Sequence, residues 1–429
     1  MIPVQPVLYK SRTAMSQTKR VAVIGAGIVG LSVALWLQRA GVRDVILIDK
    51  APPGGGASFG NAGVMADYAR VPFANWAQFK QLPRALLDRS SPVAVRRHYL
   101  PPMLRYAAGF TRACTPSRFH AGCRALVALQ RTAVQDTTTL LQHAGATSLV
   151  RDSGVLALSS SRAGLQQALA GHVGLRERLG ARAARLSAAE AAALEPAVAD
   201  FHAGGIYYPG GRYARDPHEL CLRYASQFAR AGGRFVRMEV ESIQAARHGC
   251  TVAGGGRQQA CDHVVVCTGA AGARLAAALG LRLPLVSERG YHLMLQADDI
   301  ALTRPVAWLE RSVYLTPMLG GIRVAGVAEF AQPDHPASDE LFALLEADAA
   351  TMLGRRPTVT SRWVGARPST PDSLPIVGRV PSCKAVSLAL GHGHLGLTFA
   401  AVTARLVAES VVRGDDTAEM APFLPARFA

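Results

Sequence analysis

The order of apolar and polar positions near the start of the chain predicts a strand, a helix and a second strand. Residues 21–24 form a short apolar run, which suits a strand buried in a parallel sheet. Residues 31–40 then carry apolar side chains at helical spacing, and Gly41 favours a helix end. A second apolar run, residues 45–48, ends at Asp49. This succession predicts a β–α–β unit.

Later patterns predict further elements of both kinds. Helical spacing recurs at residues 126–141, 342–353 and 397–411, and Asp216 before Pro217 is a typical helix start. Strand patterns occur at residues 154–158, 234–240, 242–246, 262–270, 283–295, 311–327 and 388–390. Residues 362–379 are rich in proline and glycine, which predicts an ordered loop rather than a regular element. At 429 residues the chain is long for one core, so two packed domains are expected.

The turn after the first strand carries three glycines in the order G-x-G-x-x-G. Gly25 allows a tight turn, Gly27 lets a pyrophosphate approach the backbone, and Gly30 lets the helix lie close to the strand. Asp49 follows at the end of the second strand, where a carboxylate can bind an adenosine ribose. A common glycine-rich turn, a membrane span or a signal peptide are the alternatives. The flanking elements favour a dinucleotide site.

Residues 52–63 (PPGGGASFGNAG) form a second glycine-rich stretch directly after this strand. The composition excludes the interior of a helix or strand and is typical of a flexible loop. Its position beside the expected ribose site favours a second backbone cradle for the cofactor.

The net charge of +17 is only weak evidence about the binding partners of the protein. Nearly all of the basic charge is arginine, which can reflect coding bias, and some of it can serve a carboxylate substrate or an anionic membrane. No Lys/Arg block has interleaved aromatics, so nucleic-acid binding is not expected. Residues 71–121 combine prolines, aromatics and arginines. This stretch predicts short amphipathic helices, either bridging domains or lying on an anionic membrane.

The seven cysteines are odd in number and contain no C-x-x-C motif. This pattern argues against a disulfide framework, a zinc site or an iron–sulfur cluster, so no metal site is predicted. It favours a reducing compartment.

Several motifs together resemble the FAD-dependent D-amino acid oxidase superfamily and, within it, the bacterial D-amino acid dehydrogenases. They cover almost the whole chain in the order VAVIGAGIVGLSVALWL, ASFGNAG, RYARDPHEL, VVVCTGA, ERGYHLML, SVYLTPM, ARPSTPDSLPIVG and GHGHLGLTFAA. The ERGYH segment is similar to dehydrogenases of D-proline-like or hydroxy-D-proline substrates.

This resemblance implies an α/β fold with a Rossmann-like FAD-binding domain and an interleaved, β-rich substrate domain of the α+β type. The FAD-binding domain would comprise residues 20–95, 201–283 and 362–429, and the substrate domain residues 96–200 and 284–361. Residues 1–19 would be a leader, with Met15 as an alternative start.

The resemblance also implies which residues hold FAD. The ADP part would lie on the first glycine motif and Asp49, and the flavin at the domain junction. The backbone of residues 393–396 would open the last helix and stabilise charge on the reduced ring. The implied cofactor residues are Gly25, Gly27, Ile28, Gly30, Asp49, Lys50, Ser58, Asn61, Ala62, Gly63, Thr268, Gly269, Gly393, His394, Leu395, Gly396, Leu397 and Thr398.

Five residues are implied in substrate binding or catalysis. Arg367 matches the arginine that binds the substrate carboxylate in glycine and D-amino acid oxidases, and Tyr314 matches a tyrosine that assists it. Tyr291 is expected to line the pocket, and His392 or His394 the flavin. The structural alternatives are an ion pair for Arg367 and packing for the tyrosines and histidines.

Relatives with covalently attached flavin carry a cysteine just before the TPD motif or a histidine near the first glycine loop. Gly365 stands roughly at the first place and residues 58–63 contain no histidine, so non-covalent FAD is expected. Ala271 and Gly272 stand where relatives often have tryptophan, which leaves the local packing open.

The resemblance implies a cytoplasmic enzyme, either free or at the inner face of a bacterial membrane, that oxidises a small or cyclic D-amino acid and reduces a quinone or another acceptor. An O2-using oxidase of glycine, sarcosine or D-amino acids is the main alternative. A catalytic subunit of a hetero-oligomer, a homo-oligomer and a tRNA-modifying flavoenzyme are the others.

Overall fold

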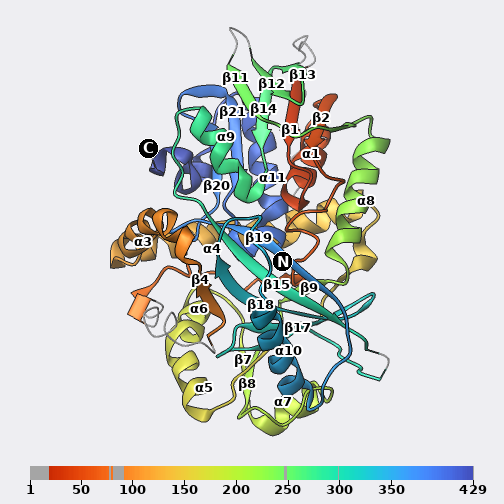
Figure 1. Ribbon diagram of the computed structural model, residues 1–429, viewed down its shortest axis with the longest axis vertical. Coiled ribbons are helices and arrows are strands. Elements are labelled where there is room, and N and C mark those ends of the chain that lie inside the picture. Colours follow the sequence, from red (N-terminus) through yellow and green to blue (C-terminus); the bar gives the residue numbers. More distant parts are fainter. Residues whose placement is uncertain (1–18, 77–78, 81–90, 246–248, 298, 429) are drawn as a thin grey trace, which may run out of the picture.

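The computed structural model describes residues 19–76, 79–80, 91–245, 249–297 and 299–428, which form two lobes (Figure 1). The upper lobe contains β1, β2 and β14, and the lower lobe contains β17, β18 and α10. Apart from Lys19, the expected leader and Met15 lie outside the described residues.

The upper lobe is built on a six-stranded sheet. Its spatial order is β10 (Arg234–Arg237), β2 (Asp44–Asp49), β1 (Arg20–Ile24), β14 (His263–Val266), β21 (Cys383–Leu390) and β20 (Ile376–Val380). All neighbours are parallel except β20 and β21. The apolar runs at the start of the chain therefore form adjacent central strands, as predicted.

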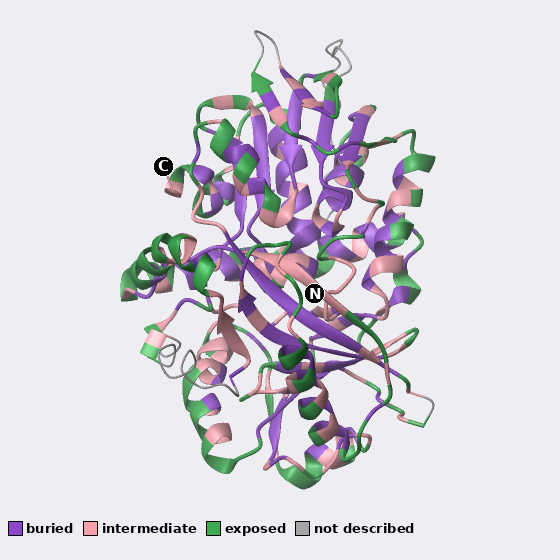
Figure 2. Cartoon of the chain, viewed as in Figure 1, coloured by how far each residue is buried: buried purple, intermediate pink, exposed green. Residues whose placement is uncertain are grey.

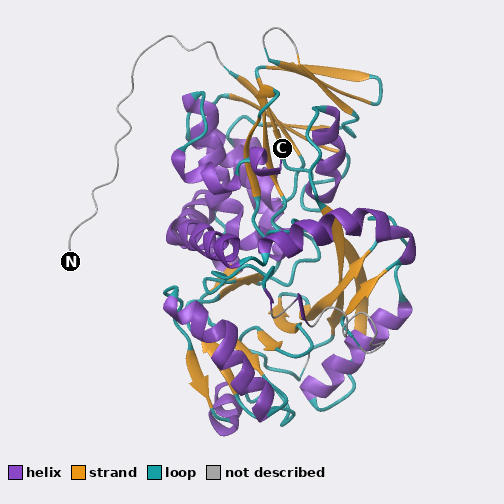
Figure 3. Cartoon of the chain, turned by 90° about the vertical axis from the view of Figure 1, so that its left-hand side faces the viewer, coloured by secondary structure: helices purple, strands orange, loops and turns teal. Residues whose placement is uncertain are grey.

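Helices cover both faces of this sheet because the side chains of its strands alternate (Figure 3). Val21 and Val23 pack on one face against α1 (Ile28–Arg39), α4 (Pro116–His143), α8 (Pro217–Arg230) and α11 (Gly396–Arg413). Ala22 and Ile24 pack on the other face beside α9 (Gly272–Ala278) and the small antiparallel sheet of β11 (Ser242–Ala245), β12 (Cys250–Gly254) and β13 (Arg257–Cys261).

The lower lobe contains a nine-stranded mixed sheet. Its order is β19 (Val359–Ser369), β15 (Val286–Leu295), β18 (Gly321–Phe330), β17 (Val313–Met318), β16 (Val306–Trp308), β6 (Val155–Leu158), β8 (Gly205–Tyr208) and β7 (Ala184–Leu186), with β4 (Val93–Val95) beside β18. α10 (Asp339–Leu353) covers one face, where its apolar side chains join a buried core (Figure 2). This is the β-rich lobe that the resemblance implied.

Further elements complete the described part of the chain. Its remaining helices are α3 (Leu100–Ala113), α5 (Arg162–Ala168), α6 (Gly174–Arg178) and α7 (Ala188–Leu194). A third small sheet holds β3 (Val64–Met65), β9 (Arg212–Ala214) and β5 (Val150–Arg151). One-turn segments are η1 (Arg97–Tyr99), η2 (Thr147–Leu149), η3 (Leu169–Val173), η4 (Gly269–Ala271), η5 (Gly393–Leu395), η6 (Ala418–Phe423) and η7 (Pro425–Phe428).

The prediction of a loop at residues 362–379 is wrong. Residues 359–369 form the long strand β19, and residues 376–380 form β20. β19 pairs only with β15 and lies at the end of its sheet, so Pro368 occupies an edge strand, where a missing N–H is tolerated. Proline content alone therefore did not exclude a strand here.

The sheets also differ from the expected domain boundaries. β4, β8 and residues 362–369 of β19 pair within the nine-stranded sheet, although the boundaries assigned all three to the FAD-binding domain. Conversely, α4 packs against α1 and α11 although it was assigned to the substrate domain. Boundaries depend on long-range pairing, which local patterns do not contain.

Of the helices in the described ranges, one is long and apolar enough to cross a membrane. It comprises residues 393–413, and most of it is buried within the protein. α1, for which a membrane span was an alternative, has 12 residues and a buried stripe against the sheet. Both helices therefore act as core helices in this structure.

We expect the replacement Gly30→Ala to destabilise the protein. An added Cβ would lie 1.8 Å from the Gly25 carbonyl oxygen, so α1 must move away from the turn. Overpacking of about 2 kcal/mol should lower the melting temperature of a chain of 429 residues by roughly 2 °C. Gly56→Ala is the control, since a Cβ there meets nothing within 4 Å. Equal melting temperatures for the two variants would contradict this packing.

Candidate active site

The first glycine motif places the start of α1 at the carboxyl end of β1. Gly25 has φ of 106°, a left-handed conformation that favours glycine, and Gly30 packs directly on the carbonyl of Gly25. The N-terminus of α1 therefore points its free N–H groups out of the sheet edge, where an anion can bind. Gly27 leaves this approach open, with only the hydroxyl of Ser58 within 4 Å of an added Cβ.

Asp49 ends β2 beside the same turn. Its Oδ2 accepts a hydrogen bond of 2.7 Å from the Ala26 N–H, and its Oδ1 accepts one of 3.0 Å from the Ala51 N–H. Each oxygen keeps a further lone pair for a ligand hydroxyl. Lys50 instead pairs with Glu239 at 3.2 Å on the surface.

The second glycine-rich stretch lies beside the first. The Ser58 hydroxyl accepts a hydrogen bond of 2.9 Å from the N–H of Ile28, the first residue of α1. The Asn61 side chain accepts one of 2.8 Å from the Gly63 N–H, across Ala62. This structure brings together the two stretches that the sequence predicted as cofactor cradles.

Arg323 of β18 joins this loop to the lower lobe, and sequence reasoning missed it. Its Nη1 donates to the carbonyl oxygens of Phe59 at 3.0 Å and Asn61 at 2.7 Å. Burial lowers the pKa of the guanidinium to about 10, while the carboxylate of Asp216 acts in the opposite direction. The group therefore stays charged at neutral pH beneath the loop. Only the pairing of distant strands shows this contact.

A third cradle forms at the C-terminal end of β14 and the start of α11. The hydroxyl of Thr268 is buried and has no hydrogen-bond partner among the described residues, and the adjoining Gly269 has open space above it. A buried polar atom without a partner is unusual in a folded protein and marks a place for a ligand. These residues, together with the glycine motif, fit the FAD group that the sequence implied.

The segment before α11 separates the two candidate histidines. His392 is buried, and its Nε2 lies 3.0 Å from the Thr403 hydroxyl. Burial lowers the pKa of His392 to about 4, so it is neutral at pH 7 and packs the helix. His394, in contrast, is exposed.

The residues that lie between the two histidines and directly after them lead into α11. Gly393 and Leu395 belong to η5, and Gly396 opens α11 itself. Leu397 is buried in the core of the upper lobe. The Thr398 hydroxyl accepts a hydrogen bond of 3.1 Å from the Ala66 N–H, which leaves the backbone rather than this side chain to face a ligand.

Arg367 forms the centre of a charged cluster between β15, β19 and η5. Its Nη1 lies 3.3 Å from Oε1 of Glu288, 3.2 Å from Nε2 of His394 and 3.1 Å from the carbonyl oxygen of Val327. Glu288 also accepts a hydrogen bond of 2.6 Å from the Ser369 hydroxyl. The guanidinium crosses Gly290, where any side chain would collide with it.

Glu288 is 6% exposed, so its charge depends on its partners. Burial alone would raise the pKa of Glu288, but His394, Arg367 and the Ser369 hydroxyl together hold that pKa well below its usual range. The carboxylate is therefore ionised at neutral pH.

The backbone of β18 is bent where it meets this cluster. The register between β15 and β18 shifts after Arg289, and Val327 on β18 has φ of 62°. A β-branched residue rarely adopts this left-handed conformation, which costs on the order of 1–3 kcal/mol. The bulge directs the Val327 carbonyl to Arg367 and thereby fixes one of its N–H groups.

The two candidate tyrosines lie in different environments. Tyr314 packs against a buried cluster that includes Tyr68, and the two hydroxyls lie within hydrogen-bonding reach of each other. Tyr291 is buried against Phe342 of α10, and its hydroxyl donates to Glu329 at 2.6 Å. Glu329 also binds the buried Arg289. The structure therefore does not bring Tyr291 to the Arg367 cluster.

Comparison with known proteins identifies the class. Residues 20–410 match the FAD dependent oxidoreductase family, and the chain belongs to this family. The protein is therefore an oxidoreductase that uses FAD as its cofactor and amino compounds as electron donors. The resemblance and the fold class expected from the sequence are both confirmed.

Individual relatives narrow the comparison. A D-amino-acid oxidase of Bradyrhizobium diazoefficiens is 30% identical over 423 residues, or 96% of this chain and all of that protein. D-amino acid dehydrogenase 2 of Pseudomonas aeruginosa is 31% identical over 426 residues, covering 95% of this chain and 98% of that protein. The structure of glycine oxidase from Geobacillus kaustophilus superposes with a TM-score of 0.73 at 23% identity, covering 96% and 99% of the two chains.

We expect Arg323→Met to weaken FAD binding. The replacement keeps the length of the side chain but leaves the carbonyl groups of Phe59 and Asn61 without their charged donor. A loss of about 1.5–3 kcal/mol would raise the dissociation constant of FAD at least about tenfold. Flavin fluorescence during dilution of the holoprotein measures it.

Arg413→Met, an exposed arginine at the end of α11, is the matched control. An unchanged dissociation constant in Arg323→Met would show that the loop does not depend on this contact.

Proposed function

We propose that the protein is a D-amino acid dehydrogenase that passes electrons to a quinone or another acceptor rather than to O2. Arg367 carries this proposal. Its guanidinium is a planar donor beside the cofactor loops, and a planar bidentate donor is the natural partner of a substrate carboxylate. Relatives named D-amino acid dehydrogenase match over more than 90% of the chain.

The surroundings of Arg367 favour a substrate that carries an amino group as well as a carboxylate. Glu288 already balances the charge of Arg367, so a carboxylate alone would add an uncompensated negative charge to a partly buried site. A zwitterionic amino acid adds both charges at once. Tyr314 is the further donor to the substrate that the resemblance implies.

The residues described above would hold FAD, which would supply a hydride acceptor for the substrate Cα. The substrate would become an imine that water hydrolyses, or a cyclic imine if it is proline-like. The chain's own residues orient the substrate and exclude water. The N-terminus of α11 supplies backbone N–H groups and a positive helix end for charge on the reduced cofactor. The ERGYH segment on β15 supports a small or cyclic substrate such as a D-proline derivative.

An O2-using D-amino acid oxidase is the second candidate. The relative named D-amino-acid oxidase, with 30% identity over 423 residues, favours it. Both candidates share the half-reaction at Arg367 and differ only in what oxidises the reduced flavin.

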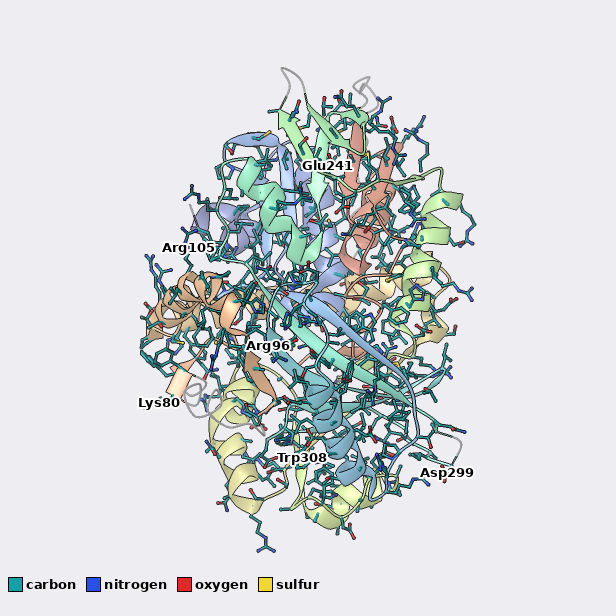
Figure 4. The ribbon with its side chains drawn as sticks, in the orientation of Figure 1. Lys80, Arg96, Arg105, Glu241, Asp299 and Trp308 are labelled. Carbon is teal, nitrogen blue, oxygen red and sulfur yellow. The ribbon has the colours of Figure 1, made fainter. Side chains whose placement is uncertain are left out.

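We further propose that the protein works in the cytoplasm, at the inner face of the membrane. α3 projects from one flank of the molecule, and Leu100 and Leu104 on it are 51% and 72% exposed (Figure 2). Lys80 and Arg105 lie on the same flank (Figure 4). Exposed apolar side chains beside basic ones fit the interface of an anionic bilayer, where the quinone would be found.

Anaerobic mixing with a panel of D- and L-amino acids, sarcosine and hydroxyproline isomers tests the function. We expect D-proline-like compounds to bleach the flavin absorbance rapidly and air to restore it slowly, while a quinone restores it fast. Stoichiometric peroxide with fast recolouring in air would favour the oxidase. Bleaching by none of these compounds would overturn both candidates.

The same assay tests the substrate site. Arg367→Leu removes the guanidinium, so we expect bleaching to need at least 100-fold more substrate while FAD stays bound. The loss of a charged hydrogen-bonding pair, about 3 kcal/mol, accounts for this size. Arg362→Leu, an exposed arginine on the same strand that pairs with Asp339, is the control. Unchanged apparent affinity in Arg367→Leu would show that the carboxylate binds elsewhere.

The membrane proposal predicts that the protein floats with vesicles containing phosphatidylserine but not with neutral phosphatidylcholine vesicles. Leu104→Asp should weaken this binding about tenfold, since it replaces an inserting apolar group by a charge that anionic lipids repel. Leu222→Asp is the control, because Leu222 lies on α8 and is 39% exposed. Equal flotation of the two variants would refute this surface.

A further inference from the structure

His394, Glu288 and Ser369 form a chain of contacts that ends in the open part of the candidate active site. Nε2 of His394 lies 2.8 Å from Oε1 of Glu288, and the Ser369 hydroxyl donates to the other carboxylate oxygen at 2.6 Å. The imidazole is 51% exposed, whereas the Glu288 side chain is 7% exposed. A buried acid thus holds one edge of an accessible imidazole next to Arg367.

The charge of Glu288 determines which nitrogen of His394 carries the proton. Burial raises the pKa of Glu288, but the contacts with His394, Arg367 and Ser369 outweigh burial and keep it ionised. An ionised carboxylate can only accept hydrogen bonds. Nε2 of His394 lies 2.8 Å from this acceptor and 3.2 Å from Arg367 Nη1, which is a donor. The shorter contact, with Glu288, assigns the hydrogen of the neutral imidazole to Nε2, and Nδ1 keeps its lone pair.

We propose that His394 is the base that takes a proton from the substrate ammonium group, with Glu288 as the positioning residue that orients it. This inference rests on the proposed function and names a residue role in it. An amino acid is bound largely as an ammonium zwitterion at neutral pH, and its nitrogen has no lone pair to assist loss of hydride from Cα. Removal of one proton supplies that lone pair.

The step is balanced. The N–H bond of the substrate breaks, its proton bonds to Nδ1 of His394, and the electron pair stays on the substrate nitrogen. That pair then forms the C=N bond as the Cα hydride leaves for the FAD that this family carries. The imidazolium lies against the ionised Glu288, which stabilises its charge and stays ionised itself.

The groups around His394 act on it in opposite directions: Glu288 stabilises an imidazolium, and Arg367 opposes one until the substrate carboxylate balances its charge. Glu288 faces it from β15 and Arg367 from β19, while the Phe73 ring lies 6.4 Å from its ring centre. Tyr106 of α3 lies near Glu288, and burial raises its pKa far above the usual range, so it stays neutral. Arg367 holds the substrate carboxylate, so the ammonium group, one carbon away, comes within reach of the neighbouring imidazole.

Stopped-flow measurement of anaerobic flavin reduction between pH 6 and pH 10 tests the proposal. We expect His394→Asn to reduce the rate about 100-fold at pH 7, the usual contribution of a general base. The defect should shrink towards pH 10, where the substrate already arrives as the free amine. A structural role would lower the rate equally at every pH and would overturn the proposal.

Glu288→Gln provides a second, independent measurement. The amide keeps a hydrogen-bond acceptor but loses the negative charge, so the ionisation seen in the rate profile should move to lower pH and the maximal rate should fall. Binding of the substrate carboxylate should not weaken, because Arg367 loses a competing partner. An unmoved profile would overturn the role of Glu288.

His120→Asn on the exposed side of α4 is the matched control and should follow the wild-type profile. Flavin content and melting temperature show whether each variant is folded. If no amino acid reduces the wild-type flavin, the proposed function and this inference both fail. If the wild-type protein is reduced and His394→Asn has the same profile, only the inference fails.

Discussion

The arrangement of the two lobes depends on the hydrogen bonds that Arg323 donates to the loop at residues 59–61. The residue belongs to the nine-stranded sheet, whereas the loop follows β2 of the six-stranded sheet. Burying a guanidinium is costly unless hydrogen bonds replace water. In the described part of the chain, two backbone carbonyls and the sulfur of Met294 provide this replacement. The contact therefore orders a glycine-rich loop that has few side chains of its own to pack.

The same sheet carries a second buried charge arrangement closer to the start of α11. Arg367 and Glu288 face each other across β19 and β15, and His394 completes the cluster from the upper lobe. Breaking one partner of such a buried pair leaves an uncompensated charge, which costs several kcal/mol. A zwitterionic ligand can enter without this cost because it brings a charge for each partner. Ligand binding at the site and the stability of the site therefore both depend on the charges of Arg367, Glu288 and His394.

Local patterns predicted those parts of the fold in which neighbours in sequence decide the structure. The apolar runs around residues 21–24 and 45–48 form central strands, and the cap at Asp216 begins α8 with hydrogen bonds to the N–H groups of His218 and Glu219. The long strand at residues 359–369 was missed because proline and glycine lower strand propensity locally. Pairing with β15 along its whole length overrides that propensity.

The sequence alone determined the class of the protein: the glycine motif, its flanking elements and the ordered series of motifs are contiguous, so they are visible without coordinates. It also pointed to Arg367 and His394, which lie in two of those motifs. Only the tertiary structure decided the rest of the site. The contact of Glu288 with both residues, the bulge at Val327 and the displacement of Tyr291 into the core follow from strand register. Register is set by pairing between distant segments, and a shift of one residue turns a side chain to the other face of a sheet.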